Sequence, residues 1–254
     1  MKVTVFPLTS RILASELEKM ATLPPVRITV ICTFLYNLGM AAAFASASGR
    51  IKGTGGTMSI LQAGLASMGY VQAGFILMGI LAVCSEYTGG QIRTSLTAVP
   101  WRGLQLSMKH LALAVIAVPT AGIMTASGVL YAFMRMNDAG AALEPEMVWR
   151  SLAGATGCLA LTALLSAAIA AICRRTAPAM VVLFGYYYVI GPLTRGSLLD
   201  LRRYFPDTAG FAMYMPITAD NTDRLTAMQG TGIMLLWVLT LLAAAIILYR
   251  RRDA

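Results

Sequence analysis

The chain has 254 residues, of which 57% are hydrophobic and 12% are charged. The charged share is about half of the ~25% that is typical of soluble domains, and the mean hydropathy is +0.70, so an ordinary soluble fold is excluded. The formal net charge of +9 would suit a nucleic-acid-binding protein, but here it borders apolar segments and suits anionic lipid head groups better. We therefore expect membrane lipid, and no nucleic acid, among the partners.

Residues 1–25 are predicted to form a cytoplasmic N-terminus with a short amphipathic helix over 10–20. Leu13, Leu17 and Met20 follow the spacing of one helical face. The charged residues of the helix lie away from that stripe: Arg11, Glu16, Glu18 and Lys19. Pro24 and Pro25 are expected to end the helix. Such a helix can lie in the membrane interface as an elbow before the first span; the alternative is a solvated N-terminal helix.

Six apolar stretches are each about long enough to cross a bilayer, which takes roughly 20 helical residues. They are 26–45, 61–84, 110–133, 151–172, 178–194 and 231–249. Lipid offers no hydrogen-bond partners to the backbone, so only helices or a closed barrel can span it. The stretches are continuous rather than alternating, which excludes a barrel. We predict an all-α membrane protein with a six-helix transmembrane domain over 26–249 and a cytoplasmic tail over 250–254.

The distribution of basic residues predicts the orientation of these spans. If the N-terminus is cytoplasmic, the inner segments hold 12 of the 20 basic residues and 4 of the 11 acidic residues. The outer segments then hold the remaining 8 basic and 7 acidic residues. Cytoplasmic segments carry an excess of Lys and Arg, so both termini are expected to be cytoplasmic.

The second span carries Gly64, Gly69, Gly74 and Gly79. A spacing of five residues does not place them on one helical face. We interpret them as sites of close helix packing; the alternative is that this helix lines an interface that moves.

The segment that joins the second and third spans predicts a short cytoplasmic helix. Ile92, Leu96 and Val99 follow helical spacing, and Pro100 ends the pattern. Its apolar edge fits a groove on another protein or a membrane surface, and the pattern alone leaves both interpretations open.

Three motifs together resemble the membrane subunits of ABC-2 type ABC exporters. The first surrounds the segment between the second and third spans and is read by Glu86, Gly90, Arg93, Leu96, Pro100, Arg102 and Lys109. The second is the run Ser-Glu-Leu-Glu-Lys over 15–19, similar to the elbow of many such permeases. The third, over 205–210, resembles their Leu-Pro-x-x-Ala-Gly piece with Phe205 in place of Leu. The six spans and the long loop before the last one extend the resemblance over the whole chain.

The resemblance implies that two membrane subunits pair with two cytoplasmic ABC ATPase subunits. The second membrane subunit is then another copy of this chain or a related chain. The sequence has no Walker A motif, so ATP and Mg²⁺ are expected on the partner, with no cofactor bound by this chain. The residues implied in ATPase coupling are Glu86, Gly90, Ile92, Arg93, Leu96, Val99 and Pro100, and those of the elbow are Ser15, Glu16 and Lys19.

Glu86 stands at the membrane end of the coupling segment. We expect it to hold the elbow or the coupling helix through a basic residue such as Arg11 or Arg93. The alternative is a solvated carboxylate with no special role.

Polar side chains inside the spans are candidates for a substrate path. They are Tyr36, Asn37, Gln72, Tyr186, Tyr187 and Tyr188. The alternative is that they join helices through hydrogen bonds or lie in an aromatic belt. No span has a charged residue near its centre, which argues against a proton relay and against an ion-coupled transporter. The outer segment 195–230 is expected to fold as short helices, or as an ordered loop.

The resulting hypothesis is a transport subunit rather than an enzyme: a permease in the bacterial plasma membrane. It would export an amphipathic drug, antimicrobial peptide or lipid-like molecule by alternating access, with antibiotic resistance as the expected role. An intramembrane enzyme is disfavoured because the single histidine, His110, leaves almost nothing from which to build a catalytic group. The alternative is a membrane sensor or immunity protein that binds a peptide and signals without transport.

Overall fold

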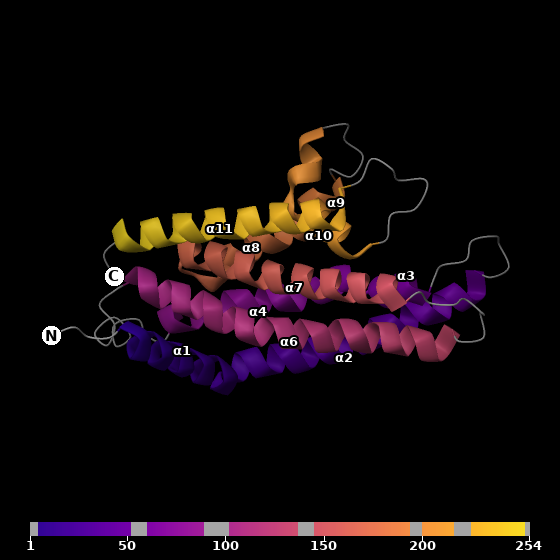
Figure 1. Cartoon of the computed structure of the whole chain (residues 1–254), viewed down its shortest axis with the longest axis horizontal. Coiled ribbons are helices and arrows are strands. Elements are labelled where there is room, and N and C mark those ends of the chain that lie inside the picture. The colour runs from indigo at the N-terminus through magenta and orange to yellow at the C-terminus, as the bar shows by residue number, and fades with distance from the viewer. Residues whose placement is uncertain are drawn as a thin grey trace.

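The computed structural model describes residues 5–51, 60–88, 102–136, 145–193, 200–215 and 225–251, and these ranges contain helices and no strand. The long helices run side by side in one elongated bundle (Figure 1). The first half comprises α1 (Val5–Thr22), α2 (Pro24–Ile51), α3 (Ile60–Leu65), α4 (Met68–Thr88) and α6 (Arg102–Met136). The second half comprises α7 (Pro145–Cys173), α8 (Thr176–Phe184), η2 (Gly185–Ile190), α9 (Gly191–Leu193), η4 (Asp200–Tyr204), α10 (Pro206–Tyr214) and α11 (Ala227–Arg251).

The prediction of six membrane spans is confirmed. Six helical segments are long and apolar enough to cross a bilayer. They are Pro24–Ala47, Ile60–Tyr87, Gly103–Arg135, Pro145–Cys173, Thr176–Leu193 and Ala227–Tyr249. Each segment contains nearly all of the apolar stretch seen in the sequence, and most of them run on into polar residues that continue the helix. The protein is therefore an all-α, multi-pass membrane protein.

Two spans depart from a regular α-helix. The second span is interrupted between α3 and α4, where Ala66 and Ser67 form a turn. The fifth span changes into a π-helix, η2, which carries the three consecutive tyrosines. Single-turn π segments inside α-helices often occur at functional sites, and both irregular segments contribute to the cavity described below.

The centre of the bundle is the contact between α4 and α7, the most extensive contact between any two helices. Over an apolar stretch of the second and fourth spans, 61% and 67% of residues are buried, against 22%, 22% and 17% for the first, fifth and sixth. The buried face of α7 is rich in alanine and serine, which lets neighbouring helices approach closely.

The glycines of the second span face three different neighbours. A Cβ at Gly64 would meet Val129 of α6, one at Gly74 would overlap Thr33 of α2, and one at Gly79 would overlap the carbonyl oxygen of Ala163 in α7. Gly69 has nothing within 4 Å of such a Cβ. The interpretation as close packing on several faces agrees with this arrangement.

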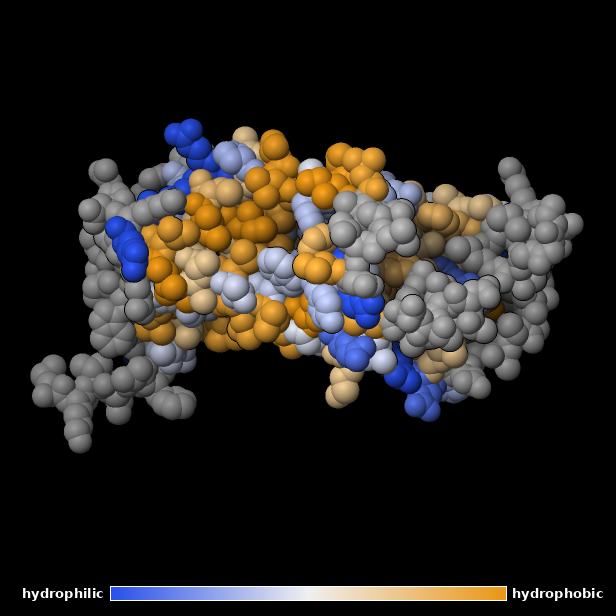
Figure 2. Space-filling model, turned by 90° about the horizontal axis from the view of Figure 1, so that it is seen from above, coloured by the Kyte–Doolittle hydropathy of each residue, from blue (hydrophilic) through white to orange (hydrophobic). Residues whose placement is uncertain are grey.

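The outer helices present large apolar side chains to the surroundings. Ile28, Ile31 and Leu35 of α2 and Val181 of α8 are exposed by more than half. Figure 2 shows apolar side chains gathered in a broad band, with hydrophilic side chains toward the ends of the bundle. This surface suits a lipid environment, where exposed apolar groups carry no penalty.

The predicted elbow helix forms as α1 but is longer than expected. It ends at Thr22, and a single residue, Leu23, separates it from Pro24, the first residue of α2, a position where proline needs no amide hydrogen. It packs mainly on α6, at the end of the bundle where α11 ends (Figure 1). The assignment of Glu16 to its polar face is wrong: Glu16 is buried beside Ile12 and Met20.

Candidate functional site

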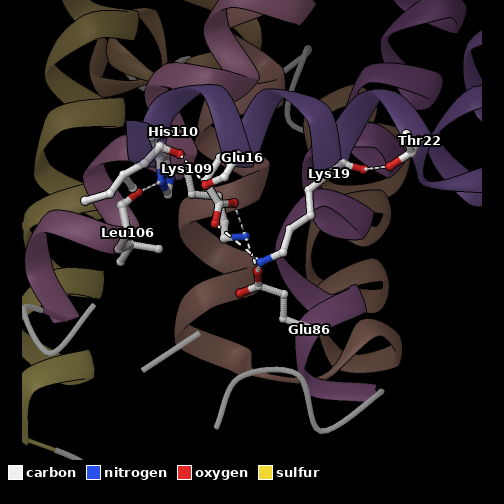
Figure 3. Close-up of polar contacts among 9 residues, drawn as sticks. Glu16, Lys19, Thr22, Glu86, Leu106, Lys109 and His110 are labelled. Carbon is white, nitrogen blue, oxygen red and sulfur yellow. Dashed lines mark hydrogen bonds and ion pairs between the residues drawn. The ribbon is translucent and has the colours of Figure 1, made fainter. Parts of the chain in front are cut away.

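Four charged side chains from three helices meet at the end of the bundle that holds α1. Glu16 and Lys19 are one turn apart on α1, Glu86 is near the end of α4, and Lys109 is in the third turn of α6. Figure 3 shows the side chains of this set, which we call the charge cluster, pointing toward one another. The convergence explains how a glutamate on α1 can be buried.

Lys109 lies at the centre of the charge cluster. Its Nζ is 2.8 Å from Glu16 Oε2 and 2.8 Å from Glu86 Oε1. Lys19 Nζ is 2.7 Å from the same Glu86 Oε1 and 3.5 Å from Glu16 Oε1. Two lysines and two glutamates thus form four short contacts and carry no net charge.

These contacts are important for stability because most of the side chains that form them are buried. The side chains of Glu16, Glu86 and Lys109 are each 6% exposed, and that of Lys19 is 36% exposed. A charge removed from water is strongly destabilising unless an opposite charge and hydrogen bonds replace the solvent. Burial alone would lower the pKa of Lys19, but its hydrogen bond to Glu86, with the attraction of Glu86 and Glu16, holds that pKa above its ordinary value.

The expected elbow and coupling residues meet only in part. Glu86 does hold the elbow, but its partners are Lys19 and Lys109; Arg11, suggested as a partner, is exposed on α1. Ser15 donates to the carbonyl oxygen of Ile12 at 2.8 Å and takes no part in the cluster. The other coupling residues, Gly90, Ile92, Arg93, Leu96, Val99 and Pro100, lie outside the described residues.

Lys109 belongs to the first motif, but it is the member of the cluster to which the sequence alone assigned no role. Glu86 lies before the segment 89–101 and Lys109 lies after it. The charge cluster therefore joins α1 to both sides of that segment. A basic residue shortly inside the start of a span is the signal that identifies it, because such a residue needs a partner. A cavity of about 240 Å³ opens beside the cluster and is lined in part by Glu16, Lys19, Glu86 and Lys109.

The polar residues of the first span occupy different environments. Asn37 is fully buried; its amide nitrogen donates to the carbonyl oxygen of Met124 at 2.9 Å and to Ser127 Oγ at 3.1 Å. Its oxygen accepts from Ser67 at 3.1 Å. Asn37 therefore joins α2, the turn before α4, and α6. Tyr36, in contrast, is 48% exposed on the outer surface of α2.

The remaining polar candidates gather around one side of the bundle. Gln72 donates to Thr162 Oγ1 of α7 at 2.9 Å, and the Tyr188 hydroxyl donates to the carbonyl oxygen of Gly69 at 2.9 Å. The Tyr186 hydroxyl donates to Asp207 Oδ1 of α10 at 2.9 Å. The bond of Gln72 ties α4 to α7, and the two tyrosine bonds tie the π-helical part of the fifth span to α4 and to α10.

A cavity of about 300 Å³ lies among α4, α7, η2 and α10. Three of the expected substrate-path residues line it, Gln72, Tyr187 and Tyr188. Tyr36, Asn37 and Tyr186 are not among the residues that line it. Asp207, which the sequence did not single out, is a lining residue. Its place in the third motif, two residues before Ala209, is the signal that could have drawn attention to it.

The described residues contain no group of three or more His, Cys, Asp or Glu side chains arranged to hold a metal ion. The opposite charges of the charge cluster can link helices mechanically, and the aromatic walls of the cavity can bind a ligand noncovalently. Comparison of the sequence with models of protein families and with curated proteins finds no match.

Proposed function

We propose that the chain is the permease subunit of an ATP-driven exporter of the ABC-2 type, with its termini in the cytoplasm of a bacterium. The single observation that carries the proposal is the charge cluster. It links α1 to Glu86 and Lys109, the residues on either side of the segment in which the sequence resembles the coupling helix of such exporters. A permease that receives its energy from a cytoplasmic ATPase needs a firm connection between the coupling segment and the membrane spans.

The charge cluster supports a specific route by which movement of the ATPase subunits would be transmitted to the membrane spans. Closure of two ATPase subunits around ATP and Mg²⁺ would displace the segment 89–101. Because Glu86 and Lys109 are bonded to each other and to α1, α4, α6 and α1 would move together. Since α4 packs on α7 at the centre of the bundle, the displacement would reach the middle of the membrane domain. ATP hydrolysis itself is assigned to the partner.

The pairing of two permease subunits is part of the same proposal. The weakly buried first and fifth spans leave broad apolar faces on α2 and α8, which suit contact with lipid or with a second permease. The outward direction of transport and the amphipathic cargo in this proposal are inferred from the resemblance to exporters.

The test is to co-express the chain with an ABC ATPase encoded beside its gene and to measure ATPase activity after purification in nanodiscs. Leu96→Arg places a charge on the apolar edge of the proposed coupling helix and is expected to abolish the stimulated activity or the complex. Leu201→Arg is the matched control, because Leu201 is 71% exposed in η4, on the outer side in the proposed orientation.

A complex that survives Leu201→Arg but not Leu96→Arg supports the permease function. If no ATPase co-purifies, or if Leu96→Arg hydrolyses ATP normally, the permease function is rejected. A peptide sensor that signals without transport would then be the function to test.

A further inference from the structure

Five of the 13 residues that line the cavity among α4, α7, η2 and α10 are aromatic. Tyr70, Tyr187, Tyr188, Phe211 and Tyr214 all line it. Tyr70, Tyr188 and Phe211 are 46%, 36% and 37% exposed, so the cavity is open to the surroundings on their side. Aromatic faces attract cations through their negative π surfaces, and more strongly where water is partly excluded.

A carboxylate completes one wall of the cavity. Asp207 lies in the first turn of α10, where the helix dipole favours a negative charge. It accepts a hydrogen bond from Tyr186 at 2.9 Å, which fixes the position of the carboxylate. Among the described residues Asp207 forms no ion pair. The nearby Arg202 donates instead to the carbonyl oxygen of Gly191 at 3.5 Å.

A buried hydroxyl adds a second polar group. Tyr187 is 7% exposed and lines the cavity, and no residue in the described ranges gives its hydroxyl a hydrogen bond of normal geometry. A buried polar group without a partner is destabilising, so a ligand that bonds to this hydroxyl gains affinity. The neighbouring Gln72 is already bonded to Thr162.

We propose that this cavity binds an amphipathic organic cation, with the positive group near Asp207 and the apolar part against the tyrosines. The carboxylate selects the sign of the charge, and the aromatic walls and the open side accept a bulky apolar group. The site lies within one copy of the chain and needs no second copy. It is a cargo site only if the proposed function holds, but binding itself requires no ATPase.

The test measures binding of tetraphenylphosphonium to the purified chain in nanodiscs, by equilibrium dialysis against empty nanodiscs. Tetraphenylborate has nearly the same shape and the opposite charge, so it serves as the matched probe. We expect saturable binding of the cation that tetraphenylborate does not displace. Asp207→Asn removes the charge but keeps an acceptor for Tyr186, and it is expected to weaken cation binding about tenfold or more.

Glu146→Gln is the control variant, because Glu146 is an exposed carboxylate at the start of α7 that does not line the cavity. It should leave binding unchanged. Ala66→Phe fills the cavity without altering any charge; it should abolish binding and decides the question if Asp207→Asn fails to fold.

The inference is overturned if the wild-type chain shows no saturable binding of the cation, if tetraphenylborate binds equally well, or if Asp207→Asn or Ala66→Phe binds as the wild type does. None of these results depends on an ATPase. Failure of binding therefore leaves the test of coupling at Leu96 intact, and failure of that test leaves the binding result intact.

Discussion

The four residues of the charge cluster are each stabilised by the others. Glu16, Glu86 and Lys109 have almost no contact with solvent, so opposite charges must replace their hydration. Glu86 Oε1 accepts from both lysines, and Lys109 contacts both glutamates. Removal of one member therefore leaves an excess charge buried among the other three, and the cost of that charge exceeds the value of the lost contact.

Lys109→Met is expected to lower the free energy of unfolding by about 3 kcal/mol, the lower end of the range for breaking a buried pair. The measurement is chemical denaturation in detergent micelles. Adding Glu86→Gln restores a neutral cluster, so the double variant should be more stable than the sum of the two single effects predicts.

Glu18→Gln is the control, because Glu18 is exposed on the same helix; a change within about 0.5 kcal/mol is expected. If Lys109→Met lowers the free energy of unfolding no more than this control does, the charge cluster does not stabilise the fold.

The raised pKa of Lys19 gives the cluster a dependence on alkaline pH. A lysine whose pKa is higher in the folded state stabilises fully below its unfolded pKa of about 10.4, and this contribution is lost as the pH rises through the folded value. The wild type should therefore lose its stability advantage over Lys19→Met as the pH rises above about 10.4 and through the folded value. Lys19→Arg, which stays charged, should retain more of its stability. Parallel curves for the wild type and Lys19→Met would contradict the prediction.

At the scale of elements, close approach between α4 and α7 sets the geometry of the bundle. A Cβ at Gly79 would overlap the backbone oxygen of Ala163, and a backbone atom cannot move aside without moving its helix. Gly79→Ala should therefore destabilise the protein by about 1–3 kcal/mol, measured as a lower denaturation midpoint.

Gly69→Ala is the matched change on the same helix. No atom lies within 4 Å of its added Cβ, and alanine favours a helix over glycine by up to about 1 kcal/mol. We expect Gly69→Ala to be neutral or stabilising. Equal effects of the two substitutions would show that the spacing of α4 and α7 is not limited at Gly79.

At the scale of the whole molecule, the orientation in the membrane remains a prediction from basic residues. It can be measured with single cysteines in a variant lacking the four natural ones, using a membrane-impermeant maleimide on intact cells. We expect Glu146→Cys to be labelled on intact cells and Arg251→Cys only after permeabilisation. The reverse pattern would place the N-terminus outside.

The spans could be predicted from the sequence because the length of an apolar stretch is a local property. The end of α1 was also predictable, since Pro24 and Pro25 act on their own neighbours. The turn at Ala66 and Ser67 and the π-helix at Tyr186–Tyr188 were not predicted, because neither segment itself contains a proline that would mark a break in the helix.

The candidate site was less accessible to sequence reasoning than the fold. Glu16 was assigned to the polar face because of its charge, although four residues before Met20 it lies beside the apolar stripe of α1. The partner that allows its burial, Lys109, lies on another helix. The cavity depends on contacts of the same kind, between η2 of the fifth span and α10. Leu96 and the other residues of the segment 89–101 stay predictions.

The charge cluster also dictates an order of events during synthesis. Glu16 and Lys109 are 93 residues apart, which takes roughly 5–20 s to translate at 5–20 residues per second. During part of that interval α1 has left the ribosome while its central partner does not yet exist. Its charges and its apolar side chains must then be accommodated separately, in water and at the lipid surface, and an amphipathic helix achieves this. The amphipathic pattern of α1 thus stabilises the helix in the nascent chain, before the charge cluster of the folded protein can form.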